Sequence, residues 1–439
     1  MFQRKVYQKL LIWKGKYASK QACLLEGARQ VGKTTIAEHF AQNEYTSYIK
    51  IDFANTTEEI LDIISNTAKL DLLFLRLQTE TGIKLIKGES AIIFDQIQCY
   101  PEARNIAKYL VKDGRYHYIE TASCLSSNIK PEEAAEYKIK MYPMDYEEFL
   151  WAAGSDSDVF HDICRLNEKM GNLINRKLMG DFRLYMAVGG MPKAVETYIA
   201  TNNFDDVDRV KRKIIELYLE ELNRMDKSGK LEKIYKAIPV QLALKKKHFI
   251  FYTAIGKSKT EKDERKLFDL LDSNIVLACY HVENPDITPV STCGLSKFRL
   301  YMADTGLLVT MLFDKAMGSQ PDIYNKLLSD KLDADLGYLY ENAAAQLLTA
   351  GERKLYYHTW KKKNSSHFYE VDFLVTLQGK IIPIEVKASA VNNERSILAF
   401  AEKYSMCAGK QYLFSQNDVS RKKNLEFKPL YMLPFLFAK

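Results

Sequence analysis

Residues 27–34 read GARQVGKT, which fits the spacing G-x-x-x-x-G-K-[ST] of a loop that binds phosphate. The two glycines let the backbone turn its N–H groups towards phosphate oxygens. Lys33 would then reach the β- and γ-phosphates, and Thr34 would supply a hydroxyl ligand to Mg²⁺. The sequence therefore predicts a site for ATP and Mg²⁺ made by Gly27, Ala28, Arg29, Gln30, Val31, Gly32, Lys33, Thr34 and Thr35.

Asp95 and Gln96 follow an apolar run in AIIFDQIQCY, residues 91–100. A carboxylate at the end of a later strand can hold the metal beside bound phosphates, although the run also fits an ordinary buried strand that ends in a turn. The neutral amide of Gln96 can orient a water molecule but cannot take its proton. We therefore predict tight ATP binding with slow hydrolysis. Thr121 and Ser123, at the end of the next predicted strand, are candidates to sense the γ-phosphate.

A second group of charged residues lies in EVDFLVTLQGKIIPIEVK, residues 370–387. If Gln378 and Gly379 form a two-residue turn, Asp372 faces Glu385 across a hairpin, because glycine suits the positive φ of such turns. Opposed Cβ atoms lie ~5 Å apart, where like charges destabilise the pair. A divalent cation between the two carboxylates would remove that cost, so we predict Asp372 and Glu385 as metal ligands.

Two further side chains belong to the same predicted site. Lys387 would point at the same place and could orient a water molecule or stabilise a phosphate in reaction. Glu341, in the predicted helix GYLYENAAAQLL, could complete the cluster. The alternative is an exposed hairpin face on which Glu370 and Lys387 form a surface ion pair of little energy.

The elements that must position these residues change in character along the chain. Residues 20–145 alternate short apolar runs with helical stretches, which is typical of a parallel sheet covered by helices. Residues 146–230 have a helical pattern, and 231–312 read as helices followed by strands. A helix and the hairpin follow from residue 336. The expected class is α/β.

Composition and charge narrow the class of protein. The 439 residues are 47% hydrophobic and 27% charged, and no apolar run approaches the ~20 residues of a membrane span, so we expect a cytoplasmic protein without a membrane partner. Seven scattered cysteines without a CxxC pair argue against structural zinc. From Glu341 onward the chain holds 15 Lys+Arg and 9 Asp+Glu, and this basic end could meet DNA or RNA.

The middle of the chain carries a second basic feature. Residues 236–256 and the segment that ends in NIVLACYHV read as helix, helix and wing. Lys245, Lys246 and Lys247 could contact DNA phosphates. Winged helices also serve as spacers or protein contacts, and both readings stay open.

Taken together, these motifs resemble the bacterial and archaeal AAA-like, STAND-type P-loop ATPases that end in a PD-(D/E)XK nuclease-like domain. The matching stretches are GARQVGKTT, IIFDQIQ, MYPMDYEEFL, YMAVGGMPKAVETY, KFRLYMADTGLL, GYLYEN and EVDFLV…IPIEVKAS. The resemblance implies a P-loop ATPase domain (1–150), a helical lid (151–230), a winged-helix segment (231–330) and a nuclease-like domain (331–439). It also implies that Pro192 lies near the nucleotide.

The resemblance has two departures, and several functions remain open. The family usually has Asp-Glu at 95–96, which puts hydrolysis in doubt, and often has Gly-Ser where this chain has Ala122-Ser123. The first hypothesis is a nucleotide-controlled switch with a Mg²⁺-dependent nuclease end. The second is a non-catalytic ATP-binding module that contacts nucleic acid or protein. The third is a slow ATPase that assembles into a homo-oligomer.

Overall fold

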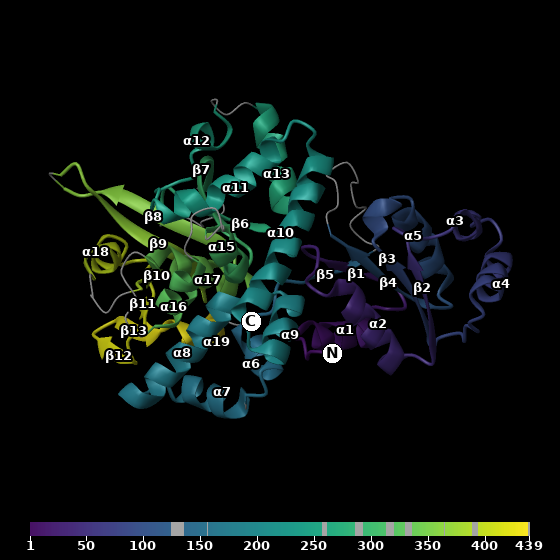
Figure 1. Ribbon diagram of the computed structural model, residues 1–439, viewed down its shortest axis with the longest axis horizontal. Coiled ribbons are helices and arrows are strands. Elements are labelled where there is room, and N and C mark those ends of the chain that lie inside the picture. The colour runs from purple at the N-terminus through teal and green to yellow at the C-terminus, as the bar shows by residue number, and fades with distance from the viewer. Residues whose placement is uncertain are drawn as a thin grey trace. The chain divides into compact units, whose positions relative to one another are not determined.

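The computed structural model describes residues 1–123, 136–155, 157–256, 261–285, 293–312, 320–329, 336–363, 365–388 and 394–437. The chain divides into two compact units (Figure 1). The first unit comprises Met1–Tyr142 and Asp272–Asn274, and the second comprises Pro143–Leu271 and Ile275–Lys439. The finer domain boundaries expected at 150, 230 and 330 stay predictions.

A five-stranded parallel sheet forms the centre of the first unit, with the strand order β2-β3-β4-β1-β5. Its strands are β1 (Ala22–Glu26), β2 (Ser47–Asp52), β3 (Ser90–Asp95), β4 (His117–Ala122) and β5 (Glu136–Lys140). The helical segments are α1 (Val6–Lys16), α2 (Lys33–Glu44), α3 (Glu58–Ser65), α4 (Leu70–Thr81), η1 (Ile97–Cys99) and α5 (Ala103–Asp113). The predicted alternation of strands and helices, and the α/β class, are confirmed.

Apolar residues explain why these segments form a sheet. Every residue of β3 is buried, as expected for a central strand of a parallel sheet covered on both faces. Phe94 and Tyr118 lie in one continuous core with residues of α3, α4 and α5. Because all five strands are parallel, their carboxyl ends meet at one edge. This edge receives the loop after β1 and the ends of β2, β3 and β4.

The second unit begins with a helical region, as the sequence predicted for 146–230. The helices of this unit are α6 (Tyr146–Ala152), α7 (Ser157–Leu166), α8 (Asn172–Val188), α9 (Pro192–Thr201), α10 (Phe204–Met225), α11 (Lys230–Ala243), α12 (Phe251–Ile255), α13 (Glu261–Asp272), α15 (Thr305–Leu312), α16 (Gln320–Leu328), α17 (Gly337–Ala350), α18 (Arg395–Lys403) and α19 (Leu433–Phe437), with η4 at Leu430–Met432. A capping box formed by Asp145 and Glu148 starts α6. No helix in the described part of the chain combines the length and apolar character needed to span a bilayer.

A mixed eight-stranded sheet organises the rest of the second unit, with the order β12-β13-β11-β10-β9-β8-β6-β7. The strands are β6 (Val276–Val282), β7 (Cys293–Met302), β8 (Leu355–Lys361), β9 (Phe368–Leu377), β10 (Lys380–Val386), β11 (Gln411–Ser415), β12 (Ser420–Lys422) and β13 (Leu425–Pro429). The antiparallel pair β6–β7, predicted as a wing, continues this sheet through β8. The segments assigned from sequence to separate domains therefore share one sheet.

The hairpin β9–β10 has the register that the sequence predicted. Lys380 pairs with Leu377, and the pairing continues to Ile384 opposite Phe373. Gln378 and Gly379 form the turn with φ of 50° and 73°, which are the positive values that a tight hairpin turn requires. Continuing the pairing by one residue brings Asp372 opposite Glu385.

Candidate functional site

The loop after β1 has the backbone conformation that a phosphate-binding loop needs. It runs from the end of β1 at Glu26 to the start of α2 at Lys33. Gln30 and Gly32 have positive φ, 69° and 94°, so the chain reverses just before the helix. The first N–H groups of an α-helix have no partner within the helix, and this positive helix end is where an anion is stabilised.

The base of the loop is tightly packed. A Cβ at Gly27 would lie 2.1 Å from the carbonyl oxygen of Met141, so only glycine fits there. The buried Arg4 donates to the carbonyl oxygen of Val31 at 2.9 Å and thereby ties the N-terminal segment to the loop. These contacts fix the shape of the loop from outside.

The ammonium group of Lys33 lies within the loop. Its Nζ donates to the carbonyl oxygens of Gly27 at 2.9 Å and Ala28 at 2.8 Å, and to Ser123 Oγ at 3.2 Å. Lys33 is 7% exposed, so this charge is held by the loop carbonyls rather than by water. Ser123, predicted as a phosphate sensor, thus lies beside the loop lysine.

Asp95 accepts two hydroxyl hydrogen bonds at the carboxyl end of β3. Thr34 Oγ1 and Thr121 Oγ1 donate to Asp95 Oδ1 at 2.7 and 2.6 Å. The carboxylate is 2% exposed. A serine or threonine hydroxyl next to an aspartate is the pair of hard oxygen donors that suits Mg²⁺. The residues predicted to hold the metal therefore lie together, although Thr121 contacts the carboxylate instead of facing the loop lysine.

Gln96 contacts a carboxylate that was not among the predicted site residues. Its Nε2 donates to Asp52 Oδ1 at 2.9 Å, and its backbone N–H donates to Thr121 Oγ1 at 3.0 Å. Gln96 has φ of 59°, which turns the chain sharply after β3. Asp52 ends β2 and is the register partner of Asp95. The sequence could have predicted Asp52 as a site residue, because it ends the strand SYIKID at the same edge of the sheet as Asp95.

In the second unit, Asp372 and Glu385 form the pair predicted across the hairpin. Asp372 Oδ2 accepts a hydrogen bond from the backbone N–H of Val386 at 2.9 Å. Glu385 is 1% exposed, and its buried Oε1 atom has no hydrogen-bond partner. A buried carboxylate oxygen without a partner is costly. A cation bound at this oxygen would remove that cost.

Lys387 neutralises only part of the negative charge of Asp372 and Glu385. Its Nζ lies 3.3 Å from Glu385 Oε2 and 4.0 Å from Asp372 Oδ2. The pKa of Glu385 is raised to about 7. Burial is the main cause of this increase, Lys387 opposes it and Asp372 adds to it. Burial acts to lower the pKa of Lys387, but the two carboxylates raise it above its ordinary value. The lysine is therefore a fixed cation.

Glu341 is close to this pair, but its carboxylate already has partners. Arg299 Nη1 donates to Glu341 Oε1 at 2.9 Å, and the hydroxyl of Tyr301 donates to the same atom. Arg299 also forms an ion pair with Glu370. The alternative of a Glu370–Lys387 surface pair is therefore wrong, because Lys387 pairs with Glu385 instead. Arg299 gave no sequence signal, since its partners are far away in the chain.

The donor set is small. Among the described residues, no group of three or more His, Cys, Asp or Glu side chains is placed to hold a metal ion. Asp372 and Glu385 alone would serve, which suits Mg²⁺ because that ion usually keeps several waters and binds one or two carboxylates.

The segment Gly190–Pro192 belongs to the second unit. The N–H of Gly190 donates to Asp304 Oδ2 at 2.6 Å, and its carbonyl accepts from Met144 N at 2.6 Å. Pro192 begins α9 at a position where its missing N–H costs nothing. The segment thus has a clear structural role, and its place near the nucleotide stays a prediction.

A family model matches the N-terminal part of the chain. Residues 19–150 match an AAA domain family, and residues 179–317 and 336–433 match two domains of unknown function. This part of the chain is therefore similar to AAA-type P-loop ATPase domains. A search of curated proteins finds no match.

Several solved structures match this chain at low sequence identity and with TM-scores below 0.5. A Walker-type ATPase of Pyrococcus abyssi is 17% identical, with 71% of this chain and 96% of that chain covered and a TM-score of 0.44. The RuvB Holliday junction branch migration motor of Thermotoga maritima is 13% identical, with coverage of 65% and 90% and a TM-score of 0.29. A STAND protein with a tetratricopeptide repeat sensor from Pyrococcus horikoshii is 13% identical, with coverage of 80% and 45% and a TM-score of 0.28.

Proposed function

We propose that this protein binds Mg·ATP in its first unit, hydrolyses it slowly and uses the nucleotide as a switch. The observation that carries the proposal is the joint placement of Lys33, Thr34 and Asp95 at one edge of the sheet. Lys33 would exchange its loop carbonyls for phosphate oxygens, and Thr34 with Asp95 would hold Mg²⁺. The ion supplies charge neutralisation for the phosphates.

Slow hydrolysis follows from the residue at 96. The amide of Gln96 can hold a water molecule by hydrogen bonds, but it has no basic lone pair to take the proton. Hydrolysis would then rest on positioning and charge stabilisation, which are the main contributions in phosphoryl transfer. A long-lived nucleotide complex suits a switch better than a motor.

Nucleotide binding is tested by titrating a fluorescent ATP analogue with Mg²⁺ against the full chain and Lys33→Ala. We expect at least a tenfold weaker Kd in the variant, since one charge-assisted contact to phosphate contributes about 1.5–3 kcal/mol. Lys9→Ala, which removes a lysine from α1 of the same unit, is the control and should leave the Kd unchanged. Equal binding by all three proteins would overturn the proposal.

A second function, metal-dependent phosphodiester hydrolysis, is favoured by the unpartnered Glu385 Oε1 opposite Asp372. With all groups ionised, Glu341, Glu370, Asp372 and Glu385 outnumber Arg299 and Lys387 by two negative charges, which one divalent cation would neutralise. Asp372 and Glu385 would hold Mg²⁺, which lowers the pKa of bound water. Lys387 would stabilise the negative charge that develops on the phosphate.

The test of this second function begins with metal alone. Calorimetry with Mn²⁺, without nucleotide, should show binding that Glu385→Gln removes and that the control Glu394→Gln, at a glutamate paired with Lys422, retains. Cleavage of DNA with Mg²⁺ or Mn²⁺ should then disappear in Asp372→Asn. Metal binding without cleavage would favour the alternative, a non-catalytic module that contacts nucleic acid or protein.

A further inference from the structure

Two lysine triplets that are distant in the sequence meet on one surface of the second unit. Lys245, Lys246 and Lys247 follow α11 and are exposed. Lys361, Lys362 and Lys363 lie at the end of the β8–β9 hairpin. Lys247 Nζ lies 4.8 Å from the ring centre of Phe368, the first residue of β9, and this contact joins the two triplets. We call this surface the lysine ribbon.

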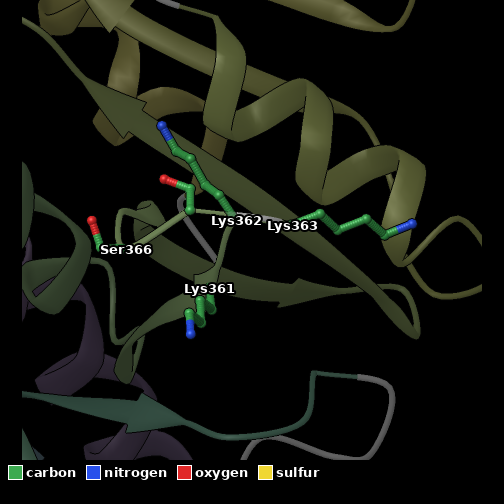
Figure 2. A pocket seen from close by; sticks show the side chains of 5 residues that line it. Lys361, Lys362, Lys363 and Ser366 are labelled. Carbon is green, nitrogen blue, oxygen red and sulfur yellow. The ribbon is translucent and has the colours of Figure 1, made fainter.

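The hairpin tip presents its charges in several directions. Figure 1 shows the β8–β9 hairpin projecting from the body of the second unit. The three lysine side chains spread apart from the tip, around an open hollow of about 670 Å³ that Ser365 and Ser366 also line (Figure 2). Lys362 Nζ rests 4.7 Å from the ring centre of Tyr369, while Lys361 and Lys363 extend into solvent.

The lysine ribbon gathers positive charge on one surface. Within the described ranges, none of its six lysines forms an ion pair with a carboxylate. Other exposed lysines of this unit do, for example Lys422 with Glu394 at 2.8 Å. Six unpaired ammonium groups close together repel one another, and a polyanion would remove that repulsion.

We propose that the lysine ribbon binds duplex DNA and presents it to the Asp372–Glu385 site. The proposal rests on the second proposed function and names its substrate. A two-stranded β-ribbon fits the ~12 Å major groove of B-DNA, where lysines spread to both sides reach phosphates of both strands. The major groove of duplex RNA is too deep and narrow for such a ribbon, and a single strand offers one row of phosphates.

The geometry of β9 links the lysine ribbon to the carboxylates. Phe368 begins the strand at the basic end, and Asp372 lies four residues along it. At ~3.3 Å per residue the two are ~13 Å apart, which is about four base pairs at ~3.4 Å rise. The backbone carbonyl of Lys247 also accepts a hydrogen bond from Arg299 Nε at 3.0 Å, so the first triplet is anchored at the carboxylate cluster.

The experiment measures binding of a fluorescent duplex of about two helical turns to the full chain in EDTA, over a series of salt concentrations. If all six lysines contact phosphates, the slope of log K against log salt should be roughly −5. The triple change of Lys361, Lys362 and Lys363 to alanine should make the slope shallower by roughly 3 and weaken binding at least tenfold at about 0.1 M salt. The charge-matched control changes Lys193, Lys213 and Lys233 to alanine and should bind like the parent.

Each outcome bears on the proposal. Equal loss in the hairpin and control variants, or equal affinity for single-stranded DNA or duplex RNA of the same length, would overturn it. Lysine-dependent DNA binding without cleavage would keep the lysine ribbon and reject the nuclease. Cleavage that ignores the hairpin lysines would keep the nuclease and reject the lysine ribbon. An unchanged urea-denaturation transition of the second unit in each variant shows that this unit is folded.

A separate observation in the first unit carries a second proposal. A carboxylate can only accept hydrogen bonds, so Asp52 selects the orientation of the Gln96 amide, with Nε2 towards Asp52 and Oε1 away from it. Oε1 receives no hydrogen bond from any described residue. Asp52 is itself fixed by Ala54 N at 3.0 Å and Asn55 Nδ2 at 2.8 Å.

We infer that Asp52 is a positioning residue for the proposed ATP hydrolysis. Asp52 keeps Gln96 Oε1 oriented to accept a hydrogen bond from the attacking water. The water oxygen forms a bond to the γ-phosphorus, the bond to the β–γ bridging oxygen breaks, and the water proton passes to a γ-phosphate oxygen. ADP and inorganic phosphate leave, and no further reactant is required.

A double-mutant cycle of Asp52→Asn and Gln96→Glu, read as phosphate release and ATP affinity, tests this role. With Gln96 present, Asp52→Asn should lower kcat about tenfold without changing Kd, because asparagine lets the amide turn. In the Gln96→Glu background, the same change should raise kcat or leave it unchanged, since it removes the repulsion between two adjacent carboxylates. Equal losses in both backgrounds would show a merely structural Asp52. No phosphate release by any variant that binds ATP would reject Asp52 as positioner but keep nucleotide binding.

Discussion

The side-chain functional groups at the two candidate sites differ in what they can still bind or donate. At position 96 an amide stands where a carboxylate would be a base, and it binds Asp52 instead of taking a proton. In the second unit, Glu385 has an oxygen without a partner, while Glu341 has its oxygen occupied by Arg299 and Tyr301. Two carboxylates of the same predicted cluster therefore differ in what they can still bind.

The buried Glu120 gives a prediction at the residue scale. Burial raises its pKa to about 8, with the nearby Glu136 adding to the shift and Arg104 opposing it. A folded-state pKa above the unfolded value means that the folded protein binds the proton more tightly. The contribution of this group to stability is therefore full below about pH 4.5 and is lost as the pH rises towards 8.

Thermal unfolding of the parent and of Glu120→Gln between pH 5 and 9 tests this. The glutamine variant cannot ionise, so its Tm relative to the parent should increase as the pH rises. We expect a difference on the order of 3 kcal/mol in unfolding free energy between the ends of the range. A difference between the two proteins that stays constant with pH would contradict a buried neutral carboxyl at this position.

At the scale of elements, strands and turns determine where the charged side chains of the second unit lie. The turn at Gln378-Gly379 and the alternation of side chains sufficed to predict the β9–β10 register, because both are local properties. The conformation of the loop before α2 could also be predicted from its local sequence. Arg299 could not be predicted, because it meets Glu341 and Glu370 only through the order β9-β8-β6-β7 and the packing of α17. Long-range pairing of this kind leaves no spacing signal.

The β9–β10 turn gives a prediction at the element scale. Gln378 has φ of 50°, which a glutamine adopts with strain and an asparagine adopts readily. Gln378→Asn should raise the free energy of unfolding of the second unit by about 0.5–1 kcal/mol, measured by urea denaturation. The register would be unchanged, so Mn²⁺ binding should persist. A destabilised variant would indicate a different turn.

A glycine after α8 gives a second prediction at this scale. A Cβ at Gly190 would lie 2.1 Å from Met144 O and 2.8 Å from Met144 N, so backbone must move. Gly190→Ala should lower the stability of the second unit by about 1–3 kcal/mol or more. Gly180→Ala, in α8 itself, meets only the end of Arg183 at 4.0 Å and should stabilise by about 0.5–1 kcal/mol. Similar effects of both changes in urea denaturation would contradict the packing described.

The whole molecule comprises two compact units, and we propose a different ligand for each. In a calorimetric scan, Mg·ATP should stabilise the transition of the first unit, and Mn²⁺ without nucleotide should stabilise that of the second. A ligand at about 100 times its Kd adds about 2.7 kcal/mol. Lys33→Ala should remove the first shift and Glu385→Gln the second. Loss of both shifts in either variant would contradict two independent sites.

The central claim is that the first unit is an ATP-binding switch whose hydrolysis is limited by Gln96. The most direct test is phosphate release from Mg·ATP by the parent chain and by Gln96→Glu, with ATP binding measured for both. We predict similar affinities and at least tenfold faster release by the glutamate form, since general-base catalysis contributes about 10²–10⁴-fold. Equal rates, or no ATP binding by either protein, would contradict the claim.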